Sequence, residues 1–165
     1  METRITGRVW KYGDDVNTDV IFPGKYTYSI TDRKEMAQHA LEDLDPTFVK
    51  NVRPGDIIVA GKNWGCGSSR EQAVTCLKEA GVGAVVARSF ARIYYRNCIN
   101  EALPIVTCDA VDGIESGDEI TIDFAAGIVT TPKGDYHFPP LPAEVMKILN
   151  AGGLIPYVRQ ELGVE

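Results

Sequence analysis

Cysteine and histidine are scarce in this chain of 165 residues. There are four cysteines, Cys66, Cys76, Cys98 and Cys108, and two histidines, His39 and His137. No two cysteines form a CxxC pair, and four thiols are too few for a disulfide scaffold. The sequence therefore predicts reduced thiols, with no zinc, iron–sulfur or other metal site in this chain.

Long apolar runs and an excess of basic residues are also missing. No stretch approaches the length of a membrane span, and Met1 to Arg4 lead into a strand-like segment without the apolar core of a signal peptide. There are 17 Lys and Arg residues against 23 Asp and Glu residues, a net charge of -6. This balance argues against nucleic acid or an anionic membrane as a partner, and we expect a cytoplasmic protein.

The order of the predicted elements indicates one α/β domain spanning residues 1–165. Strands are expected at 5–10, 57–60, 82–87 and 103–106, and helices at 32–44, 69–81, 89–102 and 141–151. Alternating strands and helices are typical of a right-handed α/β unit over a partly parallel sheet. Residues 119–130 predict a β-hairpin, and residues 160–165 a loosely held tail.

The most informative stretch is the glycine-rich run from Gly61 to Gly81. Gly65 and Gly67 allow a tight turn, and Ser68 followed by Glu71 has the spacing of a capping box, which predicts a helix beginning near Ser69. The first turn of a helix has unpaired N–H groups, and Arg70 can grip a planar carboxylate with two bonds, so an anion site is expected here. The alternative is a capped helix with a solvated arginine.

The segment Gly65-Cys66-Gly67-Ser68-Ser69-Arg70-Glu71 resembles the GxGSSRE signature of the aconitase superfamily swivel domain. Further similarity lies in residues 17–21, 88–97 and 152–156, in matching order, so the resemblance covers essentially the whole chain. Within the superfamily, the chain is similar to the small subunits of the 3-isopropylmalate dehydratase and homoaconitase families. The resemblance implies a swivelling β/β/α three-layer domain, with a partly parallel sheet and an additional hairpin or barrel-like layer.

The resemblance also implies a reaction and a set of site residues. These hydro-lyases interconvert 2-isopropylmalate and 3-isopropylmalate in leucine biosynthesis, by removing water and adding it back. Carried over by motif, Ser68 is the catalytic base, Ser69 and Arg70 hold a substrate carboxylate, and Thr18 and Asp19 face the cleft. The segment Tyr26, Thr27, Tyr28 and Ser29 helps to choose the substrate side chain; its lack of arginine favours a branched aliphatic group over a third carboxylate.

A partner subunit follows from the same resemblance. The related enzymes use the open iron of a 4Fe–4S cluster held by three cysteines as a Lewis acid, and no such triplet exists here. We therefore expect a heterodimer with a large subunit that carries the cluster. Homoaconitase and 2,3-dimethylmalate dehydratase small subunits remain alternatives, as does a non-catalytic module that binds a dicarboxylate. A self-contained serine or cysteine hydrolase is disfavoured, because the sequence lacks a GxSxG motif.

Overall fold

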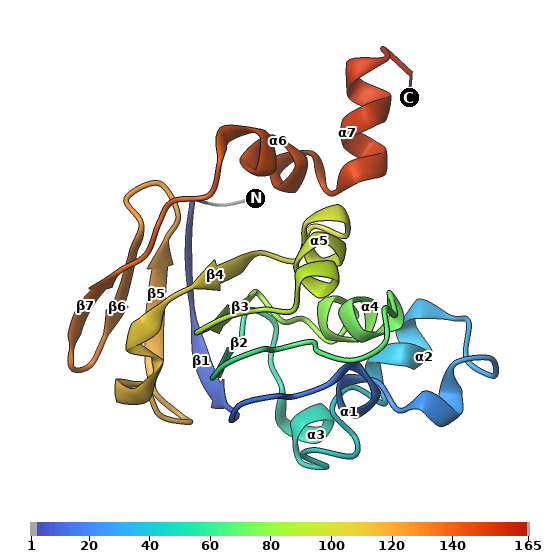
Figure 1. The fold of residues 1–165 in the computed structure, drawn as a ribbon, viewed down its shortest axis with the longest axis horizontal. Coiled ribbons are helices and arrows are strands. Elements are labelled where there is room, and N and C mark those ends of the chain that lie inside the picture. The colour runs from blue at the N-terminus through green and yellow to red at the C-terminus, as the bar shows by residue number, and fades with distance from the viewer. Residues whose placement is uncertain (1–2, 165) are drawn as a thin grey trace.

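A computed structural model describes residues 3–164 and shows one mixed sheet with the strand order β4-β3-β2-β1-β5-β6-β7 (Figure 1). The strands are β1 (Arg4–Lys11), β2 (Ile57–Ala60), β3 (Ala84–Ala87), β4 (Ile105–Thr107), β5 (Glu119–Asp123), β6 (Ile128–Thr131) and β7 (Gly134–His137). Strands β1 to β4 pair in parallel, whereas β5, β6 and β7 continue the sheet in antiparallel fashion from the other edge of β1. The predicted partly parallel sheet is confirmed.

The strands β2 and β3 are buried on both faces, as short continuous apolar runs predict. Alternate side chains enter two separate cores. Ile58 and Val85 face the helices, whereas Ile57 and Val86 face Ile120 and other apolar residues of the antiparallel strands. The parallel strands thus lie between the helices on one face and the antiparallel strands on the other, as the middle of three layers. This arrangement confirms the expected three-layer α/β fold.

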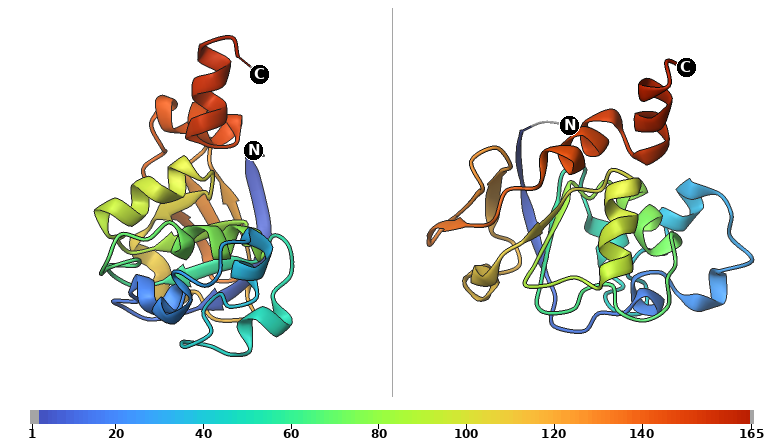
Figure 2. Two further views of the ribbon diagram at one scale, coloured as in Figure 1. Left: turned by 90° about the vertical axis from the view of Figure 1, so that its right-hand side faces the viewer. Right: turned by 45° about the horizontal axis from the view of Figure 1, so that its top comes forward.

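Helices cover one face of the parallel strands and share one core with it. They are α1 (Thr18–Ile21), α2 (Arg33–Ala37), α3 (Phe48–Asn51), α4 (Gln72–Glu79), α5 (Arg92–Asn100) and α6 (Ala143–Ala151), with the 3-10 helix η1 (Gly24–Tyr26). The 3-10 helix η2 (Asp109–Gly113) belongs to the opposite core through Val111, and α7 (Leu154–Glu161) has no buried residue. Figures 1 and 2 show α7 projecting from the rest of the molecule in all three views. Within residues 3–164, none of the helices is long and apolar enough to cross a membrane.

The predicted helix over residues 32–44 is wrong in its second half. Helix α2 ends at Ala37, and Leu41 adopts a left-handed conformation with φ of 57°. The Leu41 N–H donates to the carbonyl of Ile21 at 2.8 Å, and its side chain is fully buried. Core contact and a hydrogen bond to α1 therefore outweigh the helical spacing of the segment.

Strand β7 and helix α7 were not expected, and neither were the short helices α1, α3, η1 and η2. Strand β7 extends the predicted hairpin to three strands, because residues 128–131 pair with residues 134–137. Helix α7 follows α6 directly, separated only by Gly152 and Gly153, and it reaches Glu161, where a loose tail was predicted. Predictions that concern Met1, Glu2 and Glu165 lie outside the described residues.

Candidate active site

The candidate site lies at the carboxyl ends of three parallel strands, where ligands of α/β proteins commonly bind. Residues after β1 lead to α1, residues after β2 form the glycine-rich loop, and residues after β3 lead to α5. Two isolated parallel bridges connect these segments, one between Asn17 and Cys66 and one between Trp64 and Phe90. The three segments therefore meet in space although they are far apart in the sequence.

Gly65 and Gly67 give the loop its shape. Their φ angles are 84° and 93°, which L side chains rarely adopt. A Cβ atom at Gly65 would lie 2.2 Å from the ring of Tyr94, so the backbone needs glycine here for close contact as well. Tyr94 is itself fixed, because its hydroxyl donates to the carbonyl of Ala73 at 2.9 Å. The loop is thus held against both α4 and α5.

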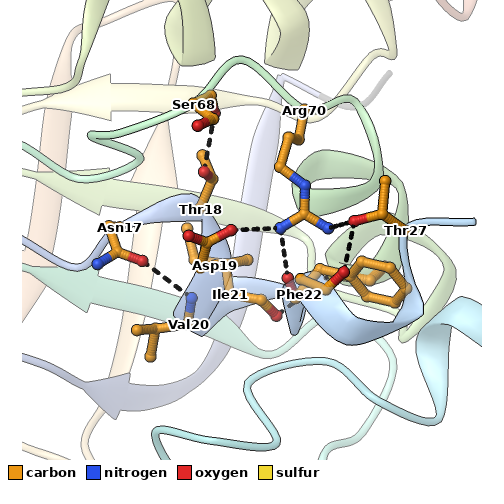
Figure 3. Close-up of polar contacts among 11 residues, drawn as sticks. Asn17, Thr18, Asp19, Val20, Ile21, Phe22, Thr27, Ser68 and Arg70 are labelled. Atoms are coloured by element: carbon orange, nitrogen blue, oxygen red, sulfur yellow. Dashed lines mark hydrogen bonds and ion pairs between the residues drawn. The ribbon is translucent and has the colours of Figure 1, made fainter.

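Thr18 fixes the serine segment from the other side. Its N–H donates to the carbonyl of Cys66 at 2.9 Å, and its Oγ1 donates to the carbonyl of Ser68 at 2.8 Å (Figure 3). Thr18 is 2% exposed. Ser68 and Ser69 are exposed, and their hydroxyls have no hydrogen-bond partner within residues 3–164. Hydrogen bonds from Thr18 therefore hold the backbone of the loop, while both hydroxyls stay accessible to a ligand.

The guanidinium of Arg70 points toward the segment after β1 (Figure 3). Nη1 donates to Oδ1 of Asp19 at 2.9 Å and to the carbonyl of Phe22 at 2.8 Å, and Nη2 donates to Oγ1 of Thr27 at 2.6 Å. The Arg70 side chain is 9% exposed, whereas that of Asp19 is 66% exposed. Arg70 thus joins two predicted site residues, Asp19 and Thr27, to the serine loop.

The predicted capping box is wrong. Helix α4 begins at Gln72, and its N-cap Glu71 has helical dihedral angles and makes no side-chain capping bond. The contacts of Thr18 and Arg70 hold residues 68–70 outside the helix, so Ser68 cannot reach the first turn as a cap. The helix ends as predicted, with Gly81 at φ of 98° and its N–H bonded to the carbonyl of Lys78.

A cavity of about 180 Å³ lies beside the loop. It is lined by Thr18, Gly65, Gly67, Ser68, Ser69, Arg70, Ala91, Arg92, Ile93, Tyr94 and Asn97. Four predicted site residues, Thr18, Ser68, Ser69 and Arg70, thus share one cavity. The α5 residues in its wall were not predicted as site residues, although the resemblance already included residues 88–97.

The segment 26–29 lies apart from this cavity. The Tyr26 ring packs 4.2 Å from the His39 ring, and its hydroxyl donates to Glu42 at 3.3 Å. Burial raises the pKa of Tyr26, and the hydrogen bond to Glu42 raises it further. Tyr28 is 96% exposed, and Ser29 is exposed as well. Among the hydrogen bonds of residues 3–164, Thr27 is the one residue of the four that is bonded to a side chain of the cavity wall, that of Arg70.

The cysteines do not form a cluster site. Within residues 3–164, no three His, Cys, Asp or Glu side chains are placed to hold a metal ion. Cys66 is partly exposed, and Cys76, Cys98 and Cys108 are buried. Burial raises the pKa of Cys76 and of Cys98, which disfavours the thiolate form that iron requires. The residues of this chain therefore do not fit an iron–sulfur cluster.

The fold and the loop define the class of the protein. It is a three-layer α/β domain with a Gly-Ser-Ser-Arg loop at the carboxyl edge of its parallel strands, and the family model of the aconitase C-terminal domain matches residues 17–110. The 3-isopropylmalate dehydratase small subunit 2 of Archaeoglobus fulgidus is 51% identical over 95% of this chain and 96% of its own length. The 3-isopropylmalate dehydratase small subunit of Caldicellulosiruptor bescii is 52% identical over 94% of this chain and 95% of its own length. The chain belongs to the 3-isopropylmalate dehydratase small-subunit family.

A solved structure supports the same assignment. The crystal structure of a 3-isopropylmalate dehydratase from Methanocaldococcus jannaschii superposes with a TM-score of 0.92 at 43% identity, covering 96% of this chain and 95% of that one. The family expected from the Gly65 to Glu71 motif is thereby confirmed. Membership of a small-subunit family implies a large-subunit partner.

Proposed function

We propose that this chain is the small subunit of a 3-isopropylmalate dehydratase, which interconverts 2-isopropylmalate and 3-isopropylmalate in leucine biosynthesis. The single observation that carries the proposal is the cavity in which Ser68, Ser69 and Thr18 meet the α5 residue Arg92. Two free hydroxyls beside a cationic side chain suit a dicarboxylate, and the relatives of this chain are named as small subunits of this enzyme.

Ser68 is proposed as the base that removes the proton beside a substrate carboxylate. Its hydroxyl is exposed within the cavity and has no partner among the described residues. A serine hydroxyl acts as a base only as an alkoxide, so nearby positive charge has to lower its pKa. Arg70 and Arg92 line the same cavity, and both stabilise negative charge there.

Ser69 and Arg70 are proposed to hold a substrate carboxylate. Because both Nη atoms of Arg70 already donate within the chain, a substrate carboxylate would take the place of the Asp19 carboxylate on Nη1. The Asp19 side chain is 66% exposed, so its carboxylate can move into solvent when a substrate carboxylate takes its place. The nearly buried guanidinium of Arg70 then stays paired with a carboxylate and keeps its bonds to Phe22 and Thr27.

The large subunit is proposed to complete the site. The cavity of about 180 Å³ is smaller than the roughly 300–1,000 Å³ of typical complete ligand pockets. We propose that the partner also carries the 4Fe–4S cluster, since the cysteines of this chain do not fit one. This chain then contributes the base, the carboxylate contacts and one wall of the pocket.

The absence of an arginine in Tyr26 to Ser29 supports a branched aliphatic substrate over a tricarboxylate. Tyr26 faces His39 and Glu42 in this chain, so Tyr28, which is exposed, is the proposed contact with the substrate side chain or with the partner. Homoaconitase and 2,3-dimethylmalate dehydratase remain the neighbouring alternatives, because their substrates share the two carboxylates that the serine loop is proposed to bind.

The proposal is tested by reconstituting the chain with the large subunit from the same source. Hydration and dehydration are then measured with isopropylmalate, homoaconitate and 2,3-dimethylmalate, each with the pair and with the isolated chain. Turnover of isopropylmalate is expected with the pair of subunits and not with the isolated chain. Turnover by the isolated chain would contradict the split site. Binding of the dicarboxylates without turnover by the pair would favour a non-catalytic binding module.

A further inference from the structure

An isoleucine in the cavity wall is exposed. Ile93 of α5 is 53% exposed, and it lines the cavity together with Ser68 and Ser69. Leaving an isoleucine side chain in water forgoes the free energy that burial would provide. Contact with an apolar part of a ligand recovers that free energy, and an isopropyl group is such a part.

Asn97 lies one helical turn further along the same face of α5. Residues at i and i+4 are neighbours on a helix surface, so Ile93 and Asn97 lie side by side. Asn97 is half-buried and lines the same cavity, and its side-chain amide forms no hydrogen bond within residues 3–164. An amide offers both a donor and an acceptor to a carboxylate or a hydroxyl group.

Neither residue is required for packing α5 against the core. The buried face of the helix is formed by Tyr94, Cys98 and Ile99. Tyr94 anchors the helix to α4 through the carbonyl of Ala73, and it also supports Gly65 of the loop. The orientation of Ile93 and Asn97 toward the cavity is therefore fixed by other residues of the helix, as a preorganised binding wall requires.

We propose that Ile93 and Asn97 are substrate-contacting residues of the dehydratase. Ile93 contacts the alkyl substituent and contributes to the choice of substrate, and Asn97 hydrogen-bonds a carboxylate or hydroxyl oxygen. This inference rests on the proposed function. It places part of the substrate specificity on α5, in addition to the segment 26–29.

The test uses the reconstituted pair of subunits with Ile93→Ala, Asn97→Ala and Asn97→Asp. The substrates are 2-isopropylmalate, 2-ethylmalate and 2-methylmalate, which differ only in the size of the alkyl group. For Ile93→Ala, kcat/KM with 2-isopropylmalate is expected to fall roughly 10-fold, within the 10–200-fold range for one methylene contact, and that with 2-methylmalate much less. For Asn97→Ala, KM is expected to rise about 10-fold, because the hydrogen bond to the substrate is lost. For Asn97→Asp, KM is expected to rise further, because the new carboxylate repels the carboxylates of the substrate.

Matched controls are available in the same chain. Asn100→Ala changes the same residue type on the same helix, at an exposed position outside the cavity, and Ile155→Ala changes an isoleucine that is 65% exposed on α7. Both controls are expected to keep the wild-type KM and the wild-type ratios of kcat/KM among the three substrates. An equal loss with all three substrates for Ile93→Ala would overturn the inference and identify Ile93 as a subunit contact. Absence of wild-type turnover with all three would instead count against the proposed function.

Discussion

Arg70 and Asp19, 51 positions apart in the sequence, form an ion pair with 2.9 Å between Nη1 and Oδ1. The arginine is nearly buried and the aspartate is largely exposed. The pair links the serine loop to the segment that contains Phe22 and Thr27, which Arg70 also contacts. Two motifs that resemble one family are thereby joined into one structural unit through a single guanidinium.

Replacing Arg70 by lysine is expected to raise KM for isopropylmalate roughly 10- to 100-fold, the effect of losing one charge-assisted hydrogen bond. A lysine has one nitrogen and cannot reach Asp19, Phe22 and Thr27 together. Steady-state kinetics of the reconstituted pair measure the change. Arg33→Lys is the control, because Arg33 forms surface ion pairs with Glu79 and Glu101. An unchanged KM in Arg70→Lys would argue against a role in binding.

Replacing Ser68 by alanine is expected to lower kcat roughly 100- to 10,000-fold, the usual contribution of a positioned general base. Substrate KM should change little, since the backbone contacts with Thr18 do not involve the Ser68 side chain. Ser69→Ala serves as the comparison, with the larger effect expected in KM. Comparable losses of kcat in both variants, with equal stability, would contradict the assignment of Ser68 as the base.

The sequence predicted the strands and the family more accurately than the helix boundaries. Apolar runs such as Ile57–Ala60 are short and β-branched, which is typical of parallel strands buried on both faces. The seven-residue motif from Gly65 is specific enough to identify the family. In contrast, the spacing of Ser68 and Glu71 matched a capping box, but contacts with residues 50 and 51 positions away hold the segment outside the helix.

The cavity wall could not be predicted for a related reason. Ile93 and Asn97 lie in a helix whose apolar and polar residues recur with ordinary spacing. What separates them from solvated residues is the packing of Tyr94 against Gly65, a contact between segments that are 29 positions apart. The left-handed conformation of Leu41 likewise depends on the distant carbonyl of Ile21. Local patterns carry no information on such contacts.

Gly65→Ala is expected to destabilise the chain more than Gly117→Ala. Both glycines have a similar positive φ, 84° and 89°, so each alanine incurs a similar backbone strain of about 1–2 kcal/mol. At Gly65 the new Cβ also meets the Tyr94 ring at 2.2 Å, whereas nothing lies within 4 Å at Gly117. Urea unfolding monitored by circular dichroism measures the free energy of unfolding of both variants. Equal losses would show that the loop adapts without contact with Tyr94.

Stability in acid is expected to depend on Asp56, which is 4% exposed. Its Oδ2 accepts hydrogen bonds from Trp10 Nε1 at 2.9 Å, from the Arg53 N–H at 2.9 Å and from Arg8 at 3.0 Å. Burial acts to raise the pKa of Asp56, but these bonds and the charge of Arg8 outweigh it, so the pKa lies below its ordinary value. The folded state therefore favours the ionised carboxylate.

The contribution of Asp56 to the free energy of unfolding is therefore present above the unfolded-state pKa of about 4, and it is lost as the pH falls through the lower pKa of the folded state. Glu42, Asp45 and Asp123 also have lowered pKa values, so the loss of wild-type stability in acid does not identify Asp56. The contribution of Asp56 is identified by the difference in the free energy of unfolding between wild type and Asp56→Asn. We expect this difference to be about 1–3 kcal/mol at pH 7 and to become smaller below pH 4. Asp135→Asn is the control, because Asp135 is exposed and its side chain has no hydrogen bond or ion pair in residues 3–164. Urea unfolding measures the free energy of unfolding of each variant. A difference between wild type and Asp56→Asn that stays constant from pH 7 to pH 3 would mean that Asp56 acts through its shape and not through its charge.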